Sequence, residues 1–112
     1  MAEIQEVATK LLERTTQGKI AWQTTAVEND FVAVIGERSV VMETFLSGWD
    51  EGVRLKILDK EGRELEALTN FQEIEGKVLG KELWDLYNAA RRVALGTGDH
   101  LKELLSELDA RT

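Results

Sequence analysis

The sequence predicts an α+β domain: an N-terminal helix, an antiparallel β-meander of four to five strands, and a C-terminal helical hairpin packed on one sheet face. Three observations predict it. Apolar residues recur with a helical period at both ends of the chain, alternate with polar residues through the middle, and are interrupted there by compact polar turns. With 112 residues and no linker-like stretch, we expect one domain over residues 1–112.

The first segment has the clearest helical pattern. Its apolar stripe is spaced for a helix over residues 3–16 and consists of Ile4, Val7, Ala8, Leu11 and Leu12. Glutamates in the first turn and Arg14 near the last suit the helix macrodipole, and Gly18 follows at a C′ position. Residues 20–25 then alternate in polarity, which predicts a first strand.

The next apolar segments predict the body of the meander. Residues 31–35 and 40–46 are separated by a compact polar turn, so we expect them to form a hairpin. Residues 53–58 alternate in polarity, as a strand with one wet face does. The turn that ends at Gly62 then favours a return strand over residues 63–68, although helix propensity there is high.

The C-terminal part begins with an ambiguous stretch, residues 69–80, where Asn70 and Glu73 could form the capping box of a short helix. A second helical stripe follows and ends at Gly96. Asp99 is a natural N-cap for a last helix. The stripe of that last helix is Leu101, Leu104, Leu105 and Leu108. Because the link between the two helices is short, we expect them to pack as an antiparallel hairpin.

Charge and composition limit the classes of partner. The net charge is −7 and the sequence pI is about 4.8, which disfavours nucleic acid and anionic membrane surfaces. The apolar runs are far shorter than the roughly 20 residues that span a bilayer. We therefore expect no nucleic-acid partner and no membrane partner. The first residues lack a signal-peptide pattern and the chain has no cysteine, so we expect a cytoplasmic protein.

No residues have the spacing of a catalytic or cofactor site. His100 is the only histidine, and with Glu103 three residues on it does not make a metal site. Ser106 falls on a different face of the same helix, and no nucleophile elbow or phosphate loop occurs. We therefore expect no enzyme activity, no cofactor and no metal.

Three residues form the candidate interaction surface. Trp49 lies in a Gly-rich acidic loop, where it either anchors an interface or folds back on the core. Arg91 and Arg92 could pair with an acidic partner or with acidic residues of a second copy. In addition, the hairpin of residues 31–46 is apolar on both faces, so either helices cover both faces or one face meets a partner.

The leading functional hypothesis is a non-catalytic interaction or accessory protein that binds another protein or a second copy of itself. One alternative is a small-molecule-binding domain with a pocket between sheet and helices. That pocket would be lined by Trp22, Phe31, Phe45 and Trp84. Another alternative is an acidic inhibitor or immunity-type protein whose charge matches a basic enzyme.

Two segments carry a resemblance to other proteins. Residues 11–22 lead from a helix into Gly-Lys-Ile-x-Trp, and residues 83–92 read Leu-x-x-Leu-Tyr-x-x-Ala-Arg-Arg. This arrangement is similar to small uncharacterised bacterial and phage domains, and the resemblance covers most of the chain. It implies the fold described above and a prokaryotic setting, and it carries no activity or site residues.

Overall fold

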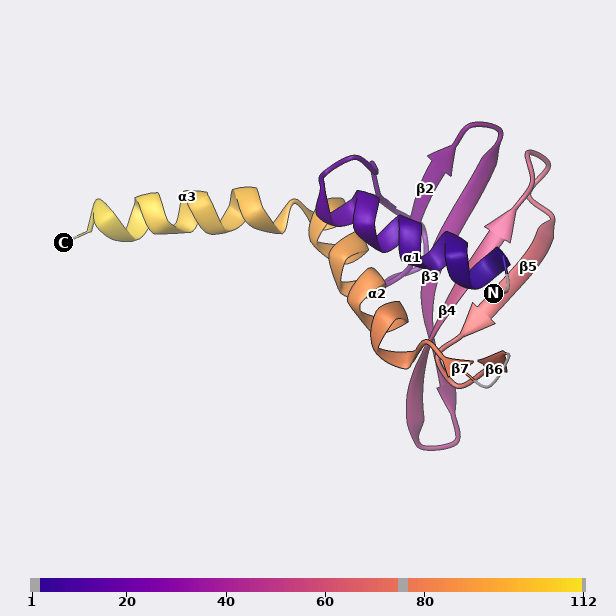
Figure 1. Cartoon of the computed structure of the whole chain (residues 1–112). Coiled ribbons are helices and arrows are strands. Elements are labelled where there is room, and N and C mark those ends of the chain that lie inside the picture. The colour runs from indigo at the N-terminus through magenta and orange to yellow at the C-terminus, as the bar shows by residue number, and fades with distance from the viewer. Residues whose placement is uncertain (1–2, 75–76, 112) are drawn as a thin grey trace.

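A computed structural model describes residues 3–74 and 77–111 and confirms the α+β class (Figure 1). The elements are α1 (Glu3–Thr16), β1 (Gln23–Thr24), β2 (Phe31–Ile35), β3 (Arg38–Ser47), β4 (Asp50–Leu58), β5 (Glu64–Thr69), β6 (Glu73–Ile74), β7 (Lys77–Val78), α2 (Gly80–Leu95) and α3 (Thr97–Asp109). Strands β1 to β5 form one antiparallel sheet in chain order, which is the expected meander, and β6 pairs with β7 separately.

The strand predictions differ from the structure mainly at the edges of the meander. The first strand is shorter than expected, because only Gln23 and Thr24 pair with β2. The return strand is confirmed as β5, and the preceding turn places Gly62 at a left-handed φ of 83°. Asn70 opens no helix: its side-chain oxygen accepts a hydrogen bond from the Val53 amide at 2.8 Å, and β6 follows.

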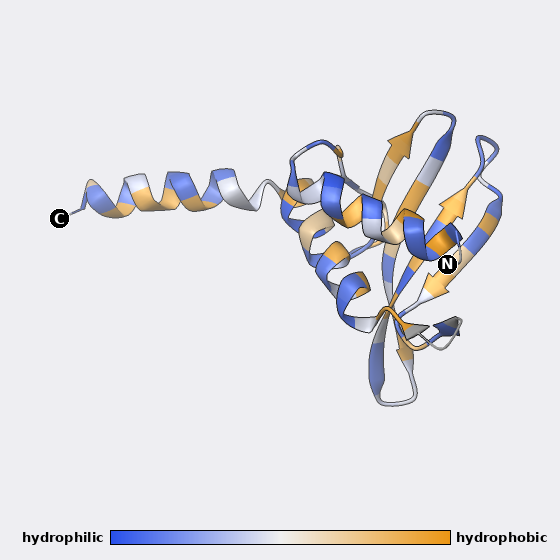
Figure 2. Ribbon diagram, in the orientation of Figure 1, coloured by the Kyte–Doolittle hydropathy of each residue, from blue (hydrophilic) through white to orange (hydrophobic). Residues whose placement is uncertain are grey.

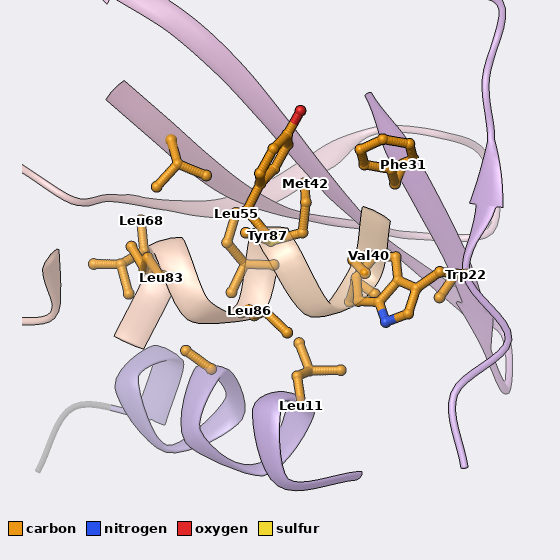
Figure 3. Packing of buried hydrophobic residues seen from close by; sticks show 14 of the residues in the cluster. Leu11, Trp22, Phe31, Val40, Met42, Leu55, Leu68, Leu83, Leu86 and Tyr87 are labelled. Carbon is orange, nitrogen blue, oxygen red and sulfur yellow. The ribbon is translucent and has the colours of Figure 1, made fainter. Parts of the chain in front are cut away.

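Helices α1 and α2 lie on the same side of the sheet, and the core lies between them and the strands (Figures 1 and 3). Side chains alternate between the two faces of a strand, so one face of β3 and β4 supplies Met42, Val53 and Leu55 to this core. Leu83 and Leu86 of α2 pack in the same cluster, and all five are completely buried. The body is therefore held by one layer of helices on one face.

Helix α3 does not fold back on α2, which corrects the expected antiparallel hairpin. It extends away from the body (Figure 1), and none of its residues is buried. The cause is the link: Gly96, at φ 62°, ends α2 by donating to the Arg92 and Val93 carbonyls, and α3 begins at the next residue. Antiparallel helix pairs need a loop of about two to five residues. Asp99 consequently lies inside the first turn and does not cap it.

Polar groups inside the core have partners. The indole N–H of Trp22 donates to the Thr15 hydroxyl at 2.9 Å, which ties the end of α1 to the segment before β1. The Tyr87 hydroxyl donates to the Asn29 carbonyl at 2.7 Å, which ties α2 to the β1–β2 connection. Within the described residues no buried side-chain nitrogen or oxygen lacks a partner.

We predict that Thr15→Val destabilises the protein by about 1–3 kcal/mol, because it leaves the buried Trp22 N–H without an acceptor while keeping the side-chain shape. The measurement is urea unfolding followed by Trp fluorescence. The control is Thr16→Val on the exposed side of the same turn, with an expected change within about 0.5 kcal/mol. Equal effects of the two substitutions would contradict the role of the hydrogen bond.

Candidate functional site

The single histidine and the serines, which a Ser–His catalytic site would combine, lie on different elements or on different faces of α3. His100 is exposed in the first turn of α3, which extends from the body, whereas Ser39 and Ser47 lie in β3. Ser106 shares α3 with His100. Among the described residues no group of three or more His, Asp or Glu side chains converges as a metal site. No helix within residues 3–74 and 77–111 has the length and apolar character to cross a membrane.

Trp49 is fully exposed at the tip of the β3–β4 hairpin and does not fold back on the core. Its neighbour Gly48 turns the chain at φ 64°, and Leu46 on the incoming strand is 76% exposed. Figure 1 shows this hairpin projecting beyond the sheet at the end opposite the start of α3. The tip is therefore an apolar protrusion flanked by the acidic residues Asp50 and Glu51.

Arg91 and Arg92 are exposed near the C-terminal end of α2, far along the body from the hairpin that carries Trp49 (Figure 1). Arg91 lines a shallow hollow of about 240 Å³ with Leu95 and residues of the β1–β2 connection. The structure thus divides the predicted interaction surface into two separate places: the hairpin tip and the end of α2.

Helix α3 carries a continuous stripe of unpartnered apolar side chains, where a stripe packed in a helical hairpin was expected. Its four leucines recur at helical spacing, and Figure 2 shows hydrophobic colouring along one side of the α3 ribbon. Their exposed fractions are 47% for Leu101, 50% for Leu104, 62% for Leu105 and 54% for Leu108. The signal that could have found this site was the one-residue link, which is too short for the chain to reverse.

An apolar groove of about 320 Å³ lies between α1 and the ends of β2 to β5. Its lining is mainly apolar, with Glu3, Arg38 and Glu66 as the charged members. The apolar lining residues are Ile4, Val7, Leu11, Ile35, Val40, Ile57 and Leu65. The groove exists because α1 does not cover the sheet face completely, so Val7 and Leu65 stay 40% and 55% exposed.

This groove is not the pocket expected from the aromatic residues, and that expected lining is wrong. Trp22 and Phe31 are plain core residues with 3% and 2% exposure. Trp84 packs at the edge of the core, with its ring centroid 5.9 Å from that of Tyr87. Phe45 points to the opposite face of the sheet, because its position in β3 alternates with that of Met42.

The outer sheet face carries a charged cluster in place of helices. Glu43 binds Arg54 at 2.9 Å and Lys56 at 3.4 Å. The Arg54 guanidinium also lies 4.4 Å from the centre of the Phe45 ring. Partial burial raises the pKa of the nearby Asp30 carboxyl, and the Glu43 charge raises it further, while Lys56 partly opposes both. This face is ordered by paired charges, so it is a weaker candidate for an apolar contact.

We predict that Asp30→Asn raises the free energy of unfolding at pH 7. A pKa above the ordinary value means that the folded state binds the Asp30 proton more tightly than the unfolded state does. Ionised Asp30 therefore costs stability at neutral pH, and the cost fades as pH falls through the raised pKa. The measurement is urea unfolding at pH 7 and pH 3, with Glu28→Gln as the exposed control. Lower stability of Asp30→Asn at pH 7 would contradict this sign.

Comparison of the chain with protein-family models, with characterised proteins and with solved structures finds no match. The resemblance to small bacterial and phage domains therefore stays a prediction. What this chain does has to be inferred from its own surfaces.

Proposed function

We propose that this chain is a non-catalytic protein-interaction module and that α3 is its contact helix. The observation that carries the proposal is the stripe of four half-exposed leucines on a helix without a buried residue. Contiguous exposed apolar surface is rare on small monomeric proteins and, where it occurs, usually marks a binding site. An amphipathic helix that enters a groove or pairs with another helix is a recurrent mode of protein recognition.

The energetics of α3 support a partner. The helix has 13 residues, and isolated helices shorter than about 12–15 residues are marginal in water. Full burial of a leucine is worth about 1.5–3 kcal/mol, so covering four half-exposed leucines would contribute about 3–6 kcal/mol from this chain. Association itself costs at least about 4 kcal/mol. The expected contact is therefore modest in affinity and stabilises the helix that makes it.

The test is the double variant Leu104→Asp with Leu105→Asp, compared with Ser106→Asp on the polar side of the same helix. Because α3 has no buried residue, we expect all of these proteins to keep the Tm of the wild type in dilute solution. We expect the leucine variant alone to lose the complexes that wild type forms, measured by sedimentation of purified protein and by cross-linking in a host-cell extract.

Two results would contradict the proposal. A Tm lowered by several degrees in the leucine variant would mean that α3 packs on its own body. Identical sedimentation and identical cross-linked species for wild type and the leucine variant would mean that the stripe makes no contact.

The groove beside α1 favours a second candidate, the binding of a small apolar molecule. Its volume of about 320 Å³ falls at the lower end of ligand pockets, and its polar groups are confined to Glu3, Arg38 and Glu66. We expect saturable binding of medium-chain fatty acids, measured by calorimetry, that Leu65→Arg removes and Leu46→Arg keeps. Failure of a graded acyl-chain series to bind would eliminate this candidate.

A further inference from the structure

The flanks of the leucine stripe on α3 have a regular charge pattern. Lys102 follows Leu101 and Asp109 follows Leu108 in the sequence. One residue is a rotation of about 100° around the helix axis, so Lys102 and Asp109 lie on the same flank of the stripe. His100 and Glu107 precede the same two leucines and lie about 100° in the other direction. Each flank thus has a basic residue, Lys102 or His100, near the N-terminal end of α3. Each has an acidic residue, Asp109 or Glu107, near the C-terminal end.

This pattern is self-complementary in one orientation only. In an antiparallel pair centred between Leu104 and Leu105, a two-fold axis brings the same flank of both copies together with its ends reversed. Lys102 then lies within about 3 Å, along the helix axis, of the level of Asp109 in the second copy. His100 faces Glu107 of the second copy in the same way. Each of these contacts occurs twice.

A parallel pair would place like charges together. Its two-fold axis runs along the helices, so opposite flanks meet at equal heights. Lys102 would lie beside His100 of the second copy, and Asp109 beside its Glu107. The like charges of Asp109 and Glu107, which would meet twice across the pair, oppose association. The charge pattern therefore distinguishes the two orientations as well as favouring a second copy as the occupant of the stripe.

The shape and total charge of the protein favour the same arrangement. The chain is 55 Å long in its largest dimension, and α3 forms the projecting end (Figure 1). An antiparallel pair leaves the two bodies at opposite ends of a contact about 20 Å long. Each chain carries a net charge of −7, so the two bodies repel each other. The distance between the bodies in this pair exceeds the screening length of about 8 Å at physiological salt, so the repulsion is largely screened.

We propose that α3 pairs antiparallel with α3 of a second copy through the leucine stripe, with Lys102 opposite Asp109 and His100 opposite Glu107. This deepens the proposed function, on which it rests, by naming the partner. The two half-exposed residues at the end of α2, Val93 and Leu95, lie at the base of α3, where the far end of the second α3 arrives. Because each copy contributes only one short helix, we expect a weak contact with a dissociation constant on the order of 10–100 µM.

The first test is sedimentation of the full chain from about 5 to 500 µM, a range chosen to bracket that affinity. We expect a monomer–dimer equilibrium that Leu104→Asp with Leu105→Asp abolishes and Ser106→Asp keeps. Lys102→Glu should weaken the dimer about tenfold, and adding Asp109→Lys should restore it by reversing both partners of the charge pair. Strengthening by Lys102→Glu alone would overturn the antiparallel orientation.

The second test reads the orientation directly, because the chain has no cysteine of its own. Leu105→Cys places thiols near the two-fold axis of an antiparallel pair, so we expect an intermolecular disulfide under mild oxidation. Leu108→Cys places them about 10 Å apart along the axis of that pair, so it should remain reduced. Efficient cross-linking of Leu108→Cys would overturn the proposal in favour of a parallel pair.

Two further outcomes separate this proposal from the more general function. A monomer at every concentration, together with leucine-dependent complexes in extract, would overturn the self-pair and leave the interaction module standing. Loss of the dimer on Leu65→Arg, in the groove beside α1, would show that α3 enters that groove of the second copy and would equally overturn the helix pair. A monomer without any leucine-dependent complex would remove both proposals.

Discussion

Apolar contact between one face of the five-stranded sheet and the two helices above it holds the body of this protein together. Met42, Val53 and Leu55 supply the strand side of that contact, and Leu83 and Leu86 supply the helix side, all without exposed surface. Hydrophobic stabilisation grows with the apolar area removed from water, so the layer that buries these side chains is the main favourable contribution to folding. The extent of this buried layer also determines which apolar surfaces stay exposed and available for binding.

Two exposed apolar surfaces follow from the extent of that layer. Helix α1 covers the sheet face incompletely, which leaves the groove that Val7 and Leu65 line. Helix α3 is held away from the face because α2 ends at Gly96 and the next helix starts without an intervening loop. The outer sheet face differs from both, since Glu43, Arg54 and Lys56 satisfy one another there. The groove and the α3 stripe are thus consequences of where the helical layer ends, whereas the exposed Trp49 and Leu46 belong to the separate β3–β4 tip.

Local features were predictable where the signal acts over a few residues. The expected helix over residues 3–16 has the same bounds as α1, because its stripe, its terminal charges and Gly18 all lie within that stretch. Strand β5 formed despite high helix propensity, since the Gly62 turn and pairing with β4 outweigh propensity. The exposure of Trp49 was not predictable, because it depends on how far the β3–β4 hairpin projects beyond the sheet. The separation of that tip from Arg91 likewise required the arrangement of whole elements.

The sequence by itself determined the order of the elements, the stripe on each helix and the charges that flank the stripe of α3. It did not determine which stripes are buried. The stripes of α2 and α3 follow the same period, yet Leu86 is completely buried and Leu105 is 62% exposed. Only the tertiary structure decided between them, because burial requires a complementary surface within reach. For α3, the one-residue link at Gly96 puts the sheet out of reach.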